Sequence, residues 1–112
     1  MKSSDEWGKD PAVQAMRRMF GRMEAAQGRL LNDTGITPFD TRLRLWRRMA
    51  RALFEKAWSE AGRRGMETGE EKAAVIYLFC LAALMVRDGV DVPETALPRD
   101  PDIERLIREI DP

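Results

Sequence analysis

The chain contains no histidine and a single cysteine, Cys80, and these two scarcities exclude most of the usual metal and catalytic centres. Zinc, copper and haem sites draw their protein ligands mainly from histidine and cysteine. One cysteine cannot form an intrachain disulfide, so an extracellular framework stapled by disulfides is excluded. We therefore expect no metal, no cofactor and no catalytic residue, and a function that is not enzymatic.

Long apolar stretches are also missing. The longest run without a charge, from Ala73 to Val86, has 14 residues, whereas a helix that crosses a bilayer needs about 20. No apolar stretch of the kind found in secretory signals follows Met1, and no glycine-rich phosphate loop or catalytic-serine motif is present. We expect a cytoplasmic protein without a membrane span.

Net charge is absent as well, since 19 basic and 19 acidic residues cancel. The cancellation hides a gradient along the chain. Residues 36–65 carry eight positive and three negative charges, a net of +5, whereas residues 66–112 carry five and eleven, a net of −6. The basic middle segment and the acidic last segment are therefore expected to attract each other or to attract different partners.

The residues that are present predict helices. Asp10-Pro11, Thr37-Pro38 and Asp100-Pro101 each place a capping residue before a proline, the typical start of a helix. Apolar residues then recur at spacings of three and four, the period of an amphipathic helix. No stretch alternates long enough to read as a strand. The patterns predict four helices, at about residues 11–31, 38–61, 69–87 and 101–110.

The third predicted helix is apolar on every face and must therefore be covered on every side. We expect its start to be capped by Thr68 and Glu71, and its end to lie at Asp88-Gly89. Short connections favour antiparallel neighbours. The sequence thus predicts an all-α antiparallel three-helix bundle with a short fourth helix packed across it, formed by residues 10–112 as one domain behind a flexible arm of residues 1–9.

Two neighbours and a short lid leave part of such an apolar surface for another subunit, so we expect a homodimer. The first helix carries the candidate interface. Its apolar stripe follows a coiled-coil spacing, and a tryptophan at the edge of the second helix is a suitable anchor. The residues assigned to this interface are Met16, Met19, Met23, Gln27 and Trp58. The alternative is that the methionines fill an irregular core.

Four arginines share one face of the second predicted helix, namely Arg44, Arg47, Arg48 and Arg51. Clustered guanidinium groups can contact the phosphates of a polyanion. No aromatic residue is interleaved with them, so we favour a solvated face or one neutralised by the acidic segment 88–111. On that interpretation the protein shows no detectable binding to nucleic acid near physiological salt.

The sequence favours a small helical protein-interaction or regulatory module that self-associates. One alternative is a nucleic-acid-associated regulator that uses the arginine face. A second alternative is a small-ligand binder or enzyme with a pocket beside the apolar third helix, near Tyr77 and Cys80. We expect Cys80 itself to be a buried structural thiol, because its neighbours along the chain are apolar.

Overall fold

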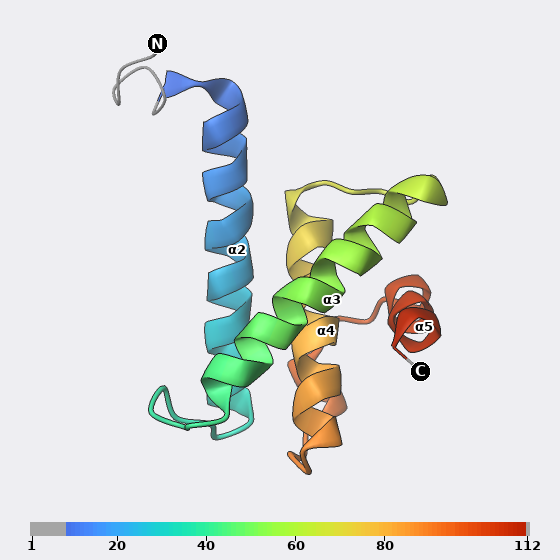
Figure 1. Cartoon of the computed structure of the whole chain (residues 1–112). Coiled ribbons are helices and arrows are strands. Elements are labelled where there is room, and N and C mark those ends of the chain that lie inside the picture. The colour runs from blue at the N-terminus through green and yellow to red at the C-terminus, as the bar shows by residue number, and fades with distance from the viewer. Residues whose placement is uncertain (1–8, 112) are drawn as a thin grey trace.

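A computed structural model describes residues 9–111. Within these residues the chain is entirely helical and contains no strand, so the all-α class predicted from the sequence is confirmed. The helices, shown in Figure 1, are α2 (Pro11–Asp33), α3 (Leu43–Arg63), α4 (Glu70–Arg87), the short 3-10 helix η1 (Glu94–Ala96) and α5 (Pro101–Ile110).

Helix α4 is the centre of the bundle. It packs against α2 and α3 and also contacts α5, which in turn contacts α3. The chain runs down through α2, up through α3 and down again through α4, with α3 inclined across the other two (Figure 1). The radius of gyration is 15.1 Å, larger than the roughly 13 Å of a compact domain of this length. The excess indicates that part of the chain extends away from the core.

The uncharged run of α4 supplies more of the buried core residues than any other helix, as its composition predicts. Ten of the residues of α4 are buried, from Ala73 to Met85. Val86, in the last turn of α4, is 55 % exposed, so the neighbouring helices no longer cover α4 at this point. Neighbouring helices supply the remaining core side chains, of which Trp46 on α3, Leu30 on α2 and Leu106 on α5 are at most 1 % exposed.

Two of the four predicted helix caps are present, at Asp10 and Asp100, and two are not. Asp10 accepts a hydrogen bond from the amide of Ala12 at 2.8 Å, and Asp100 accepts one from the amide of Ile103 at 3.2 Å. The capping pair predicted from Thr68 and Glu71 is wrong. The N-cap of α4 is Gly69, which has no side chain, and no side-chain hydrogen bond caps this end of the helix. The carboxylates at the start of α4 are engaged with arginines of α2 instead.

The three long helices end in the same way. Gly35, Gly65 and Gly89 have φ values of 72°, 72° and 87°, in the left-handed region that favours glycine. The residue after each glycine donates its amide to a carbonyl five positions earlier, as in a Schellman motif. These bonds are Ile36 to Leu31 (2.9 Å), Met66 to Ala61 (2.9 Å) and Val90 to Met85 (3.0 Å). The donors also pack against the core, which fixes the direction of each exit loop.

Helix α3 begins at Leu43, not at residue 38 as Thr37-Pro38 predicted. The difference has a local cause. Asp40 accepts hydrogen bonds from the backbone amide of Arg42 at 2.9 Å and from its guanidinium at 3.1 and 2.9 Å, which holds residues 40–42 in a turn. The apolar spacing of the second predicted helix puts Phe39 at the start of its core stripe, and this assignment is wrong, since the side chain is 91 % exposed.

Candidate functional site

The first candidate surface lies on the N-terminal half of α2. Arg18 donates to Glu70 at 2.8 Å, which places Arg18 level with the first turn of α4. The turns of α2 before it rise beyond the start of α4 and stand apart from α3 (Figure 1). Met16, in these turns, is 53 % exposed. Phe20, just after Arg18, is 37 % exposed with the guanidinium of Arg51 on α3 5.6 Å from its ring centre, and both residues continue the stripe that is buried at Met23. We call Val13, Met16 and Phe20 the α2 face.

The other residues assigned to an interface from the sequence lie elsewhere. Met23 is 3 % exposed and belongs to the core, and Met19 packs against that core as a partly buried residue. The Oε1 of Gln27 accepts a hydrogen bond from the hydroxyl of Tyr77 at 2.6 Å, so this amide serves contact within the chain. Trp58 is partly buried and stacks on Phe54, with ring centroids 5.6 Å apart.

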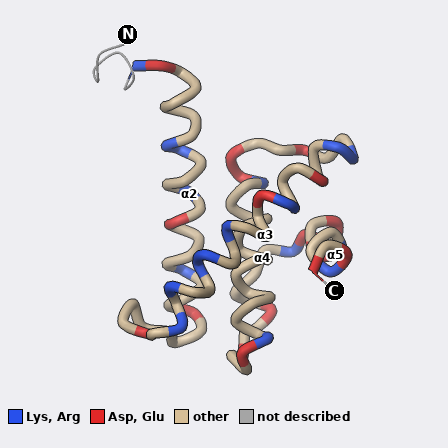
Figure 2. Tube along the Cα trace, in the orientation of Figure 1, with Lys and Arg blue, Asp and Glu red and all other residues tan. Residues whose placement is uncertain are grey.

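The second candidate surface is the arginine face of α3. Figure 2 shows basic residues recurring along this helix. Arg47 approaches Glu24 of α2 at 3.8 Å, and the guanidinium of Arg51 lies 5.6 Å from the ring centre of Phe20. Arg44 and Arg48 are exposed, and no carboxylate of residues 9–111 lies within ion-pair distance of either. Two of the four guanidinium groups therefore face solvent without a partner in the described chain.

The acidic C-terminal segment is used in other places. Glu109 pairs with Arg64 at 2.6 Å, Asp111 with Arg87 at 2.7 Å, and Asp100 with Lys72. Asp88 accepts a hydrogen bond from the indole Nε1 of Trp46 at 2.6 Å. Segment 88–111 therefore does not neutralise the arginine face, which was one of the two alternatives, because its carboxylates pair with Arg64, Lys72 and Arg87, and Asp88 binds an indole and not a guanidinium of that face.

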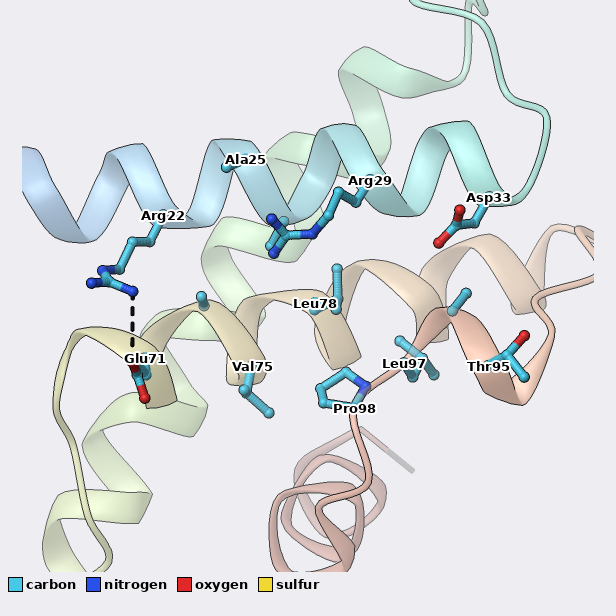
Figure 3. Close-up of a pocket in the computed structure, with 13 residues that line it drawn as sticks. Arg22, Ala25, Arg29, Asp33, Glu71, Val75, Leu78, Thr95, Leu97 and Pro98 are labelled. Atoms are coloured by element: carbon cyan, nitrogen blue, oxygen red, sulfur yellow. Dashed lines mark ion pairs between the residues drawn. The ribbon is translucent and has the colours of Figure 1, made fainter.

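A groove between α2 and α4 is closed at one end by the segment after η1 (Figure 3). It has a volume of about 550 Å³. Its floor is apolar, and the charged residues at its rim include Arg29 and Asp33, which are one helical turn apart and do not pair with each other. Arg22 and Glu71 close the other end at 3.8 Å. The lining residues are Arg22, Ala25, Ala26, Arg29, Asp33, Glu71, Ala74, Val75, Leu78, Thr95, Ala96, Leu97 and Pro98.

This groove lies beside α4, but it is not lined by Tyr77 or Cys80, where the sequence placed a possible pocket. Cys80 is fully buried, and burial raises the pKa of its thiol to about 12. Burial also raises the pKa of the Tyr77 hydroxyl, although the nearby Arg47 and Arg51 oppose that rise. Both groups are thus held in their neutral forms near neutral pH, and Cys80 is a poor nucleophile.

Nowhere in the described part of the chain do three or more acidic or thiol side chains gather closely enough to hold a metal ion. None of the helices between residues 9 and 111 has the length and apolar character needed to cross a bilayer.

Comparison with known proteins gives no relative. No protein-family model matches the chain, and no curated protein or solved structure matches it either.

Proposed function

We propose that the protein is a small cytoplasmic, non-enzymatic regulatory module that acts by binding protein, and that its partner at the α2 face is a second copy of this chain. The observation that supports the proposal most directly is the exposure of Met16 and Phe20, at 53 % and 37 %, on a stripe that is otherwise core. Apolar side chains that continue a core stripe into solvent are typical of a surface that another chain covers.

The pattern on α2 suits self-association. A two-fold interface places the same surface on both subunits, so its residues must be complementary to themselves. When two α2 helices lie antiparallel and are centred between Phe20 and Gly21, Arg17 of one copy faces Glu24 of the other, since both lie about 5 Å along the axis from the centre. This register joins opposite charges twice, once at each end.

The same register uses an exposed glycine. A side chain added at Gly21 meets nothing within 4 Å in the single chain, so this flank of α2 is open. In the antiparallel pair, Phe20 of each copy lies against Gly21 of the other, where the missing side chain leaves room for the ring. Glycine in the middle of a helix costs roughly 0.5–1 kcal/mol relative to alanine, and a close helix contact supplies a reason to retain it.

Sedimentation equilibrium tests the proposal. We expect the wild type to form a dimer at micromolar concentration, and both Met16→Glu and Phe20→Glu to shift it toward monomer. Leu45→Glu is the matched control, because Leu45 is 54 % exposed on α3 and lies outside the α2 face. A monomeric wild type at high concentration contradicts the proposal, as does equal weakening by the control.

A charge exchange tests the register itself. Arg17→Glu and Glu24→Arg should each weaken the dimer, because each places like charges opposite one another, and the double variant should restore it. Failure of the double variant to recover, with both single variants folded, contradicts the antiparallel register.

A further inference from the structure

A hollow lies where the loop before α3 meets the helix. Its volume is about 460 Å³, and it is lined by Pro38, Asp40 and Leu43 together with all four residues of the arginine face, Arg44, Arg47, Arg48 and Arg51. The arginines therefore border a concave surface of a size that small ligands or single nucleotides occupy.

The charge in this hollow is unbalanced. Its only acidic lining residue, Asp40, is already paired, because both of its carboxylate oxygens accept hydrogen bonds from the Arg42 guanidinium, and the pKa of Asp40 is lowered by that pairing. Arg44 and Arg48 have no ionic partner among residues 9–111, and the contact of Arg47 with Glu24 is long, at 3.8 Å. A planar guanidinium binds two phosphate oxygens at once, which matches this cluster to a phosphate-bearing ligand.

An exposed aromatic residue lies in the chain segment that borders the hollow. Phe39 is 91 % exposed and lies in the chain between Pro38 and Asp40, both of which line the hollow. From the sequence no aromatic residue accompanied these arginines, because Phe39 was assigned to the core. Arginines that contact a phosphate backbone beside a ring on which a base can stack are the usual components of a surface for single-stranded nucleic acid.

We propose that this hollow binds single-stranded nucleic acid, with the arginine face contacting successive backbone phosphates and Phe39 stacking on a base. The net charge of the chain is zero, so long-range attraction of a polyanion is weak and binding depends on these local contacts. The hollow borders the α2 face at Arg51, whose guanidinium lies 5.6 Å from the ring centre of Phe20, but the proposal does not depend on self-association.

Fluorescence anisotropy with a labelled oligothymidylate of about 12 nucleotides tests it. We expect binding at about 50 mM salt that weakens as salt rises, with a log–log slope of about −0.7 for each phosphate contacted. The double variant Arg44→Gln/Arg48→Gln should flatten that slope by about 1.4. Phe39→Ser should weaken binding about tenfold and leave the slope unchanged, because it removes stacking and no charge.

The matched control is Arg99→Gln/Arg105→Gln, which removes the same charge from exposed positions near and on α5. An equal loss of affinity in this control means that binding depends on the total charge of the protein and not on the arginines of the hollow, which overturns the proposal. Circular dichroism verifies that each variant folds; the α2-face variant Met16→Glu should bind the oligonucleotide as the wild type does.

Two competitors distinguish the source of the phosphates. Inorganic tripolyphosphate should displace the oligonucleotide poorly, because it offers no base, and duplex DNA should bind more weakly than the single strand. Displacement by tripolyphosphate at equal phosphate concentration, with Phe39→Ser unchanged from wild type, overturns the assignment to nucleic acid. Absence of any binding at about 50 mM salt overturns it as well.

Discussion

Tyr77 on α4 donates its hydroxyl hydrogen to the side-chain oxygen of Gln27 on α2 at 2.6 Å. This bond joins the two helices in a partly buried position, and it explains why a polar residue interrupts the apolar stripe of α2. Gln27, which the sequence assigned to an interface between subunits, thus makes its hydrogen bond within one chain. The bond fixes how α2 is placed along α4, because an apolar residue at either position would leave the other polar group without its partner.

Tyr77→Phe should therefore lower the free energy of unfolding by about 1–2 kcal/mol, since the amide of Gln27 loses its partner in a partly buried site. Urea denaturation at neutral pH measures the change. The double variant Tyr77→Phe/Gln27→Met should be less destabilised than the sum of the two single variants. Strict additivity would show that the bond contributes nothing to stability.

Phe39→Ser should change stability by less than about 0.5 kcal/mol, because the ring is 91 % exposed and lies before the helix begins. Leu43→Ala, four residues later, should cost about 2–5 kcal/mol, because Leu43 is the first buried residue of α3. Thermal unfolding of the two variants compares them directly. A large loss for Phe39→Ser would place this ring in the core, as the sequence pattern suggested.

Cys80 should react with a maleimide in water only when the chain unfolds, since the thiol is fully buried and its pKa is raised to about 12. Mass spectrometry after timed labelling, with and without urea, measures this. Cys80→Ser should fold and lose about 1–3 kcal/mol for the buried hydroxyl. Rapid modification in native buffer would be inconsistent with the buried position.

Stability should fall at acid pH partly through Glu70. Arg18 and then Arg22 lower the pKa of its carboxyl below the ordinary value of 4.5. A lowered pKa in the folded state stabilises the protein above the unfolded-state value, and that stabilisation is lost as pH falls through the folded-state value. Glu70→Gln should therefore melt at a lower temperature than wild type at pH 7, and the difference should shrink as pH drops below 4.5.

Glu55→Gln is the control for this measurement, because Glu55 is exposed and has no ion pair among residues 9–111. Its melting profile should follow that of the wild type. A constant difference between Glu70→Gln and wild type across the acid range would show that the ion pairs of Glu70 do not govern this dependence.

Local signals allowed the helices to be predicted from the sequence. Asp10 and Asp100 cap as their position before proline indicates, and the uncharged run of α4 is buried as its composition indicates. The start of α3 was not predictable in the same way, because the bonds that Asp40 makes to Arg42 compete with the cap at Thr37. The helix start signalled by Thr37-Pro38 was thus overridden by the bonds between Asp40 and Arg42. The spacing of apolar residues gives no sign of these bonds.

The candidate surfaces depended on long-range contacts, and here sequence reasoning was weaker. The spacing of apolar residues on α2 identified an apolar stripe. Which residues of the stripe are buried depends on where α4 begins beside α2, and the spacing does not give that position. The sequence left open whether the arginine face is solvated or covered by the acidic segment, and in the structure Glu109 reaches Arg64 and Asp111 reaches Arg87. The net charges of two segments indicate that the segments attract each other, but they do not show which acidic and basic side chains come within ion-pair distance.

The central position of α4 also determines which helix can detach while the others stay packed together. Helices α3, α4 and α5 contact one another, whereas α2 contacts α4 and η1, which are distant from it in the chain. Because the backbone of α2 lies close to neither α3 nor α5, its detachment leaves the other three helices in contact with one another. Amide hydrogens of α2 should exchange with solvent by a partial opening of lower free energy than global unfolding, with the earliest exchange in the turns that precede Arg18.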